Sequence, residues 1–156
     1  MSPSRLSVSV DEVAPASAPD LIPIRMLLER SGLPTADLES AQPEFTVIRE
    51  NGEVVAAGAL QPFGSSALLR SVVVAPDRRR TGLGRRVLGE LERKARTARI
   101  VQLVLLTQTA KDFFARQGYR VIERSKAPRE VQSSEEFRSL CPGTAVCMVK
   151  RLTALK

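Results

Sequence analysis

Two glycines follow a run of arginines in the segment Arg79-Arg-Thr-Gly-Leu-Gly-Arg85, and this combination suits the binding of a phosphate-bearing anion. A branched strand, Val72 to Val74, leads into the segment, and a helical pattern follows it. The first backbone amides of a helix have no intrahelical acceptor and lie at the positive end of the helix dipole. Glycine at 82 and 84 lets an anion approach them closely, and arginines add charge-assisted hydrogen bonds. The segment therefore predicts a pyrophosphate site.

The positive charge of the chain is concentrated around this segment. The chain carries 24 basic and 17 acidic residues, which gives a net charge of +7. Nine basic and two acidic residues lie between Arg78 and Arg99, so this stretch accounts for the whole excess. Such a cluster indicates an anionic partner, although a solvated helix face carries charge in the same way. A helix that binds nucleic acid is a competing interpretation, but aromatic residues make up only 4% of the chain, so stacking platforms are scarce.

Other kinds of site fail on particular residues. The chain has no histidine, which excludes Ser-His and Cys-His catalysis and histidine-ligated metals. A Walker A loop needs Lys and then Ser or Thr after its last glycine, where this chain has Arg85-Arg86. A Rossmann fingerprint needs a third small residue where Val87 stands. Cys141 and Cys147 lack metal-ligand spacing and are interpreted as small buried side chains, so no metal is predicted.

Hydrophobic periodicity predicts the elements that position the segment. Phe45–Arg49 and Val54–Leu60 flank Asn51-Gly52, which is a strong hairpin signal. Further strands are expected at Leu6–Val10, Ala67–Val74, Ile100–Leu106, Tyr119–Glu123 and Thr144–Leu152, with a chain break over Pro62–Ser66. Helices are expected at Ile24–Arg30 capped by Asp20, at Gly82–Arg99 with an apolar stripe of Leu83, Val87, Leu88, Leu91 and Ala95, from Thr109 to Gly118, and as a turn at Glu135–Leu140. This order predicts a mixed α/β sheet in one layer with helices on both faces.

The length of 156 residues suits one domain, which we expect to span residues 1–156, with residues 1–5 open to disorder. No apolar run approaches the roughly 20 residues that a membrane span needs. The first ten residues lack the apolar stretch and cleavage site of a signal peptide. We therefore expect a soluble, cytoplasmic protein without a membrane partner.

Arg79-Arg-Thr-Gly-Leu-Gly84, after a strand that closes on Val-x-x-Pro, resembles the acetyl-CoA signature Arg/Gln-x-x-Gly-x-Gly/Ala of the GCN5-related N-acetyltransferase (GNAT) family. The stretch from Ala110 to Tyr119 is similar to the family's A-x-x-F-Y-x-x-x-G-F segment. The resemblance covers about Phe45 to Leu152 and implies one GNAT-like domain, with a mixed, mostly antiparallel sheet, splayed central strands and helices on both faces. The stretches 136–142 and 145–148 further resemble the GNAT subgroup encoded with arsenic-resistance genes.

The resemblance implies acetyl-CoA as co-substrate and gives roles to matching positions. Backbone groups of Val72, Val73 and Val74 would pair with the pantetheine arm as an added strand does. The N–H near Val73 would polarise the thioester carbonyl, which a bound amine attacks directly. Amides along the loop would hold the pyrophosphate, at Arg79, Arg80, Thr81, Gly82, Leu83, Gly84 and Arg85.

The chain departs from the family pattern where a proton donor is expected. Phe114 occupies the slot in which many members carry a tyrosine that protonates the leaving thiolate. Tyr119 is interpreted mainly as a core residue, with the acid as an alternative, and Thr109 as a helix cap. The general base is unassigned, because each of Glu44, Glu50 and Glu53 fits a surface position near the hairpin. A protein that binds acetyl-CoA without catalysis, as a sensor, therefore stays open.

Arg70 alternates with core residues on one strand face, so its charge needs a partner. One interpretation is a clamp on a substrate carboxylate, beside Ser71, and the other is a salt bridge within the protein or between subunits. The favoured function is N-acetylation of a small-molecule amine, including an organoarsenical or amino-acid-like toxin in detoxification. A protein or peptide N-terminus is the alternative acceptor. Nucleic acid is not an expected partner, and a homodimer is suggested by analogy with the fold.

Overall fold

The computed structural model describes residues 12–140 and 143–153, apart from the side chains at 12, 139 and 140, and its centre is a seven-stranded sheet. The sheet order is β2-β3-β4-β5-β6-β8-β7. The pair β5 and β6 is parallel, and the other five pairs of the described strands are antiparallel. The strands are β2 (Glu12–Pro15), β3 (Glu44–Glu50), β4 (Glu53–Phe63), β5 (Ser66–Val74), β6 (Gln102–Thr107), β7 (Arg120–Ile122) and β8 (Val146–Arg151). The strand expected at Leu6–Val10, residues 1–5 and Cys141 lie outside the described residues.

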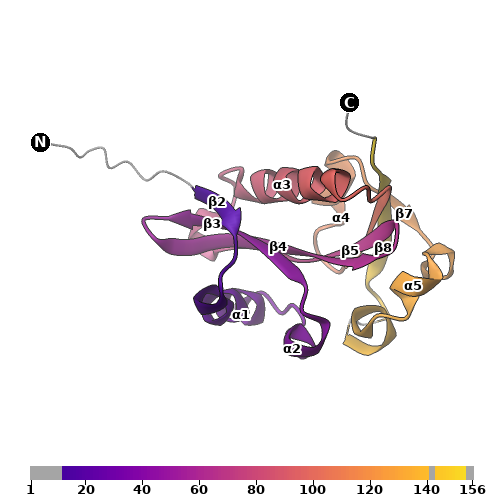
Figure 1. Ribbon diagram of the computed structural model, residues 1–156, viewed down its shortest axis with the longest axis horizontal. Coiled ribbons are helices and arrows are strands. Elements are labelled where there is room, and N and C mark those ends of the chain that lie inside the picture. The colour runs from indigo at the N-terminus through magenta and orange to yellow at the C-terminus, as the bar shows by residue number, and fades with distance from the viewer. Residues whose placement is uncertain (1–11, 141–142, 154–156) are drawn as a thin grey trace, which may run out of the picture.

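Helices cover both faces of this sheet, as expected (Figure 1). The long helix α3 (Leu83–Thr97) lies on one face, and α1 (Leu21–Arg30) and α2 (Leu38–Ala41) lie on the other. The remaining helical pieces are α4 (Lys111–Arg116), α5 (Arg129–Gln132), the short 3₁₀ turns η1 (Ala18–Asp20), η2 (Pro76–Arg78) and η3 (Arg124–Lys126), and a π-helical turn η4 (Glu136–Leu140). The predicted fold class is therefore confirmed.

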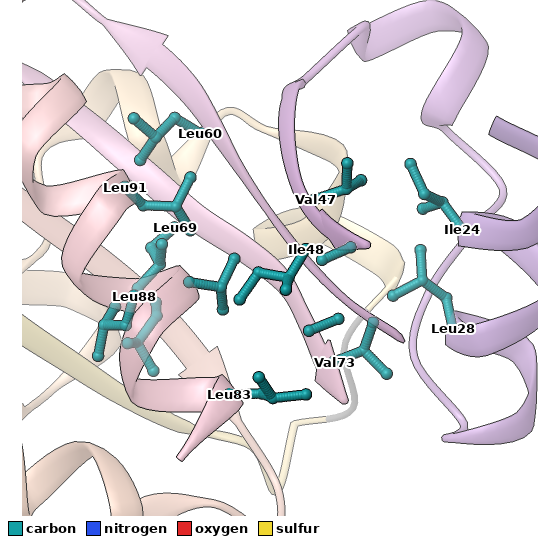
Figure 2. Close-up of a cluster of buried hydrophobic side chains, with 14 of the residues drawn as sticks. Ile24, Leu28, Val47, Ile48, Leu60, Leu69, Val73, Leu83, Leu88 and Leu91 are labelled. Carbon is teal, nitrogen blue, oxygen red and sulfur yellow. The ribbon is translucent and has the colours of Figure 1, made fainter. Parts of the chain in front are cut away.

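The core lies between α3, the sheet and α1. The predicted apolar stripe of α3 is confirmed, since Leu83, Val87, Leu88, Leu91 and Ala95 are all buried. Figure 2 shows Leu83, Leu88 and Leu91 reaching the sheet from one side, and Ile24 and Leu28 of α1 reaching it from the other. Each fully buried side chain of this size contributes roughly 1.5–3 kcal/mol relative to exposure. Burial of this stripe fixes the position of the first turn of α3, which carries the glycine segment.

Two local expectations need correction. The break expected over Pro62–Ser66 is present but narrower, since β4 ends at Phe63 and β5 begins at Ser66. Pro62 itself lies within β4, two residues past the last pairing of β4 with β3, where its missing N–H interrupts no ladder on that edge. Asp20 precedes α1 but makes no side-chain cap there. Its carboxylate instead accepts hydrogen bonds from the Ser17 N–H at 2.7 Å and from the Arg49 guanidinium, so it joins η1 to β3.

Gly58 of β4 lets α3 approach the sheet closely. A Cβ at Gly58 would lie 2.7 Å from Leu91 Cδ1 and 3.4 Å from Val72 Cγ2. We expect Gly58→Ala to lower the free energy of unfolding by about 1–3 kcal/mol, because the leucine must leave a packed position. Chemical denaturation checks this value.

Gly89 on the exposed side of α3 provides the matched control. A Cβ there meets nothing within 4 Å, so Gly89→Ala is expected to stabilise the helix by about 0.5–1 kcal/mol. Combining Gly58→Ala with Leu91→Val should recover part of the loss, since the shortened side chain lacks the clashing methyl. Equal stability of Gly58→Ala and wild type would contradict the tight contact.

Candidate functional site

The two central strands separate and open a cleft between them. Parallel pairing joins residues 66–68 of β5 to residues 102–104 of β6 and then ends. Beyond these three pairs the strands enclose a cleft of about 760 Å³, lined by residues 69–74 of β5 and 105–107 of β6. The expected splay is therefore confirmed. This part of β5 pairs with β4 along one edge, and its other edge faces the cleft instead of β6, so an extended ligand can pair with it there.

A β-bulge interrupts β5 within the cleft. Ala57 of β4 pairs with Val73 and Ala59 pairs with Arg70, so a single residue of β4 opposes two residues of β5. Ser71 takes a left-handed conformation with φ of 59°, which is uncommon outside glycine. Bulges of this kind redirect backbone groups next to functional sites. Ser71 and Val72 have no register partner in β4, and Val73, whose N–H is expected to polarise the thioester, follows them directly.

The arginine-glycine loop connects β5 to α3 and holds two left-handed residues. Arg80 has φ of 67° and Gly82 has φ of 86°, and a Cβ at Gly82 would meet nothing within 4 Å. At the start of α3, the Arg86 N–H donates to the Gly82 carbonyl at 3.1 Å. The amides of Leu83 to Arg85 precede it in the first helical turn, where no intrahelical acceptor is available. The loop therefore presents the open, amide-rich geometry that an anion needs.

The second glycine of the loop also makes room for packing. A Cβ at Gly84 would lie 3.4 Å from Phe113 Cζ and 3.7 Å from Val74 Cγ2. Gly84 thus allows α4 and β5 to pack against the first turn of α3, and it also lines the cleft. Arg79 lines the same cleft and donates to Ser31 Oγ at 3.3 Å, and Arg80 and Arg85 are exposed.

The far wall of the cleft comes from the end of β6 and from α4. The expected cap at Thr109 is wrong: the Ala110 N–H donates to the Thr107 hydroxyl at 3.0 Å, and Thr109 lines the cleft. Phe114 is buried and lines the cleft with a ring that carries no hydroxyl. Tyr119 packs edge-on against Phe114 and donates to Glu92 at 2.8 Å. Burial and the nearby Glu92 charge raise the pKa of Tyr119, which matches the core role.

Arg70 lies at the centre of a buried polar cluster that joins three parts of the chain. Its Nη1 and Nη2 donate to the two carboxylate oxygens of Asp37 at 2.7 and 2.6 Å. Gln61 Oε1 accepts from Nη1 at 3.2 Å, and Ser71 Oγ accepts from Nε at 3.4 Å. Glu136 Oε1 also lies 3.4 Å from Nε. The internal salt bridge that the sequence left open is therefore present, and the guanidinium is fully covered.

Glu136 is the second carboxylate around this one cation. Its side chain is 4% exposed, as is that of Asp37. Burial raises the pKa of Glu136 to about 7, against the opposing charge of Arg70 and with the help of Asp37. The sequence offered no signal for this group beyond its acidic type, because 66 positions separate it from Arg70.

The three glutamates considered as bases lie away from the cleft lining. Glu44 and Glu53 are exposed, and Glu50 accepts a hydrogen bond from Arg78 Nε at 2.6 Å. Cys147 is buried, and burial raises the pKa of its thiol to about 11, which suits the packing role expected of it. Within the described residues, no helix combines the length and apolar character that a bilayer crossing requires.

Comparison with known proteins decides the family. Residues 41–121, just over half of the chain, match the family described as "Acetyltransferase (GNAT) domain". The chain belongs to the GNAT acetyltransferase family. Acetyl-CoA is the co-substrate of this family, which agrees with the resemblance in the loop and the α4 segment.

Individual proteins are also similar to this GNAT domain. An "Amino-acid acetyltransferase" of Aliivibrio fischeri is 32% identical over 103 residues, which are 65% of this chain and 23% of that protein. N-acetylglutamate synthase from Neisseria gonorrhoeae, complexed with coenzyme A and N-acetyl-glutamate, superposes with a TM-score of 0.79 at 22% identity, over 93% of this chain and 36% of that one. Rv2747 from Mycobacterium tuberculosis, in complex with CoA and NLQ, gives 0.77 at 25% identity, over 91% and 99%. The chain spans about a quarter of the length of the curated relatives it matches.

Proposed function

We propose that this chain is an acetyl-CoA-dependent N-acetyltransferase that acts on a small amine. The observation that carries the proposal is the cleft between β5 and β6, which ends at the open loop before α3. A pyrophosphate fits the loop because Gly82 leaves space above the first amides of the helix. The pantetheine arm then lies along Val72 to Val74 as an added strand. The side chains of Arg79, Arg80 and Arg85 provide positive charge for the remaining phosphate oxygens.

Catalysis follows from this placement. Acetyl-CoA supplies an activated acetyl thioester, and the bulge at Ser71 and Val72 directs backbone N–H groups to where its carbonyl oxygen becomes an oxyanion. The acceptor enters from the end bounded by Ser71 and Thr107, both of which line the cleft. Its nitrogen attacks the carbonyl carbon, and the thiolate leaves. Phe114 has no proton to give, so the thiolate departs without a tyrosine acid, which its low basicity permits.

The acceptor that we propose is an amino acid or a close analogue. The support is the amino-acid acetyltransferase name of the relatives, together with the N-acetyl-glutamate in one of the fold neighbours. An organoarsenical that carries an amino-acid moiety belongs to the same chemical class, and detoxification would then be the role. A protein N-terminus is the alternative, and an elongated acceptor needs the cleft to stay open at the Ser71 end.

Two properties expected from the sequence belong to this proposal. A homodimer and a cytoplasmic location both stay predictions. The basic residues between Arg78 and Arg99 are assigned to coenzyme phosphates in preference to nucleic acid. The twofold mass of a dimer is measurable by light scattering at the concentration of the activity assay.

Thiol release and ligand-induced stabilisation test the proposal together. Acetyl-CoA is expected to raise the melting temperature, whereas NAD and ATP are not, because a ligand bound only by the folded state stabilises it. At saturation 100-fold above Kd the gain is about 2.7 kcal/mol. A panel of amino acids, aminated arsenicals and short peptides is then assayed for release of the coenzyme A thiol.

Each outcome has one meaning. Release with an amino acid or an aminated arsenical supports the small-amine enzyme, and release confined to peptides selects the alternative acceptor. A thermal shift with no release from any amine selects the acetyl-CoA sensor, which Phe114 favours. No thermal shift at millimolar acetyl-CoA contradicts every form of the proposal.

A further inference from the structure

Ser71 adopts a backbone conformation that needs support from its surroundings. Its φ of 59° lies in the left-handed region, which serine seldom occupies, and the residue is buried in the wall of the cleft. Such a conformation costs energy and persists only where neighbouring contacts hold it. The groups that hold Ser71 therefore determine the shape of β5 where the thioester is proposed to lie.

The bulge at Ser71 also changes the side-chain alternation of β5. Arg70 reaches Asp37 at the start of α2, whereas Val72 lies on the α3 side, where its Cγ2 is 3.4 Å from the position of a Cβ on Gly58. In a regular strand residues 70 and 72 would share one face of the sheet. Without the bulge, Arg70 or Val72 would have to leave its present face, and the backbone N–H groups between them would change direction.

Arg70, which directly precedes the bulge, is fixed by groups from two other parts of the chain. Asp37 Oδ2 and Oδ1 accept from Nη1 and Nη2 at 2.7 and 2.6 Å, and Gln61 Oε1 of β4 accepts from Nη1 at 3.2 Å. The remaining nitrogen, Nε, donates to Ser71 Oγ at 3.4 Å. Because Arg70 is bonded to Ser71 through the backbone, a guanidinium held in this way also holds the chain that enters the bulge.

Asp37 binds this guanidinium instead of capping its own helix. It is the N-cap residue of α2, where aspartate commonly accepts from the backbone amides of the first turn, but its side chain makes no such hydrogen bond. Both carboxylate oxygens bind Arg70. A buried ion pair seldom adds net stability over packed apolar groups, because both charges lose their water. A requirement on the position of Arg70 therefore explains this arrangement better than the stability of α2 does.

We propose that Asp37 is a positioning residue for acetyl transfer. Through Arg70 it holds Ser71 in the left-handed bulge, and it thereby sets the direction of the backbone N–H groups that polarise the thioester carbonyl. This inference rests on the proposed acetyl transfer to a small amine. Hydrogen bonds to that carbonyl strengthen as its oxygen becomes an oxyanion, so Asp37 should act on kcat and leave coenzyme binding at the loop before α3 unaffected.

The effect of Asp37→Asn, measured with and without Ser71→Gly, tests the proposal. Asparagine keeps the size of Asp37, and Arg70 retains Glu136 as a charged neighbour 3.4 Å from Nε, so the variant should fold. Glycine adopts a left-handed conformation without support, so Ser71→Gly makes the bulge independent of Asp37. We expect Asp37→Asn alone to lower kcat about tenfold or more, because small misplacements at the reacting carbonyl are costly. Relative to Ser71→Gly, the double variant should lose less than about threefold in kcat.

Two further variants complete the kinetic test. Glu39→Gln breaks the exposed ion pair of the same helix with Arg25 and should leave kcat at the wild-type value. If Asp37→Asn does not fold, Gln61→Met removes a weaker contact of the same guanidinium. It should also lower kcat, and again the loss should be smaller when Ser71→Gly is present. The Kd for acetyl-CoA should be the same for all of these variants, as measured by calorimetric titration.

The infrared carbonyl band of bound acetyl-CoA, labelled with ¹³C at the thioester carbon, reports the hydrogen bond without any turnover. A hydrogen bond to the carbonyl oxygen lowers the frequency of this band. We expect the band of the wild-type complex to lie below that of the Asp37→Asn complex. Adding Ser71→Gly to Asp37→Asn should return the band toward its wild-type frequency.

The possible outcomes are distinct. An equal loss of kcat with and without Ser71→Gly, or a carbonyl band that Asp37→Asn does not move, overturns the proposal and shows that Asp37 only stabilises the fold. A higher KM for the acceptor at unchanged kcat overturns it in favour of substrate contact. Wild type that binds acetyl-CoA but releases thiol with no amine overturns the proposed function, and the carbonyl band then decides this inference by itself. Wild type that does not bind acetyl-CoA overturns both.

Discussion

Arg70→Met is expected to lower the free energy of unfolding by about 3–5 kcal/mol at pH 7, the usual loss when a buried ion pair is left with an uncompensated charge. Methionine fills much of the same volume but leaves Asp37 and Glu136 facing each other without a cation. The Arg70 side chain is 0% exposed, so water cannot replace it without opening the site between β5, α2 and η4. Urea denaturation monitored by circular dichroism measures the loss.

The control for Arg70→Met is Arg25→Met. This substitution breaks an ion pair with Glu39, whose side chain is 68% exposed. That loss should stay below about 1 kcal/mol. Lowering the pH to 5 should recover part of the stability of Arg70→Met, because the stranded carboxylates bind protons. A stable Arg70→Met protein whose only defect is a higher KM for the acceptor would restore the substrate-clamp interpretation.

The second large effect is expected at the loop. Gly82→Glu should remove the acetyl-CoA-induced rise in melting temperature, which corresponds to at least a 100-fold loss of affinity, or about 2.7 kcal/mol. The carboxylate would lie where the pyrophosphate must approach the first amides of α3, and like charges repel there. Calorimetric titration with acetyl-CoA gives the change in Kd directly.

Gly64→Glu separates charge at the site from backbone strain. Gly64 has φ of 67° and, like Gly82, open space around its Cβ position, but it lies in the β4–β5 turn at the other end of β5. Both substitutions place a glutamate in a left-handed backbone conformation at a similar energetic cost. The free energies of unfolding of the two variants without acetyl-CoA should therefore be alike. Acetyl-CoA should stabilise Gly64→Glu as it does wild type. If acetyl-CoA still stabilises Gly82→Glu as it does wild type, the pyrophosphate does not bind at this loop.

Hydrophobic periodicity predicted the parts of the fold that local physics determines. The stripe from Leu83 to Ala95 and the hairpin at Asn51-Gly52 depend on residues close in sequence, and both are confirmed. The same holds for Gly118, whose φ of 97° ends the segment after α4. These features position the candidate site, so its location at the start of α3 could be inferred from the chain alone.

The interior of the site could not be predicted in this way. Asp37 and Arg70 are 33 positions apart and neither carries a local signature of the other. Ser71 adopts a left-handed conformation that serine rarely takes, so the bulge has no sequence signal such as glycine would give. The expected side-chain cap of α4 at Thr109 is absent: Ala110 is the N-cap residue, and the end of β6 brings the Thr107 hydroxyl to its amide. In each case a tertiary contact selects among options that the local sequence leaves equal.

The short parallel contact between β5 and β6 divides the sheet into two sections. One section runs from β2 to β5 and the other from β6 to β7. Within the sheet, three residue pairs between β5 and β6 connect the two sections. A coenzyme whose amide-bearing arm forms hydrogen bonds along β5 would lie between these two sections. It would extend the hydrogen bonding of the sheet beyond the point where β5 and β6 stop pairing. Binding of the coenzyme would therefore couple the unfolding of the two sections. A chain saturated with coenzyme should unfold as one unit across the full width of the sheet.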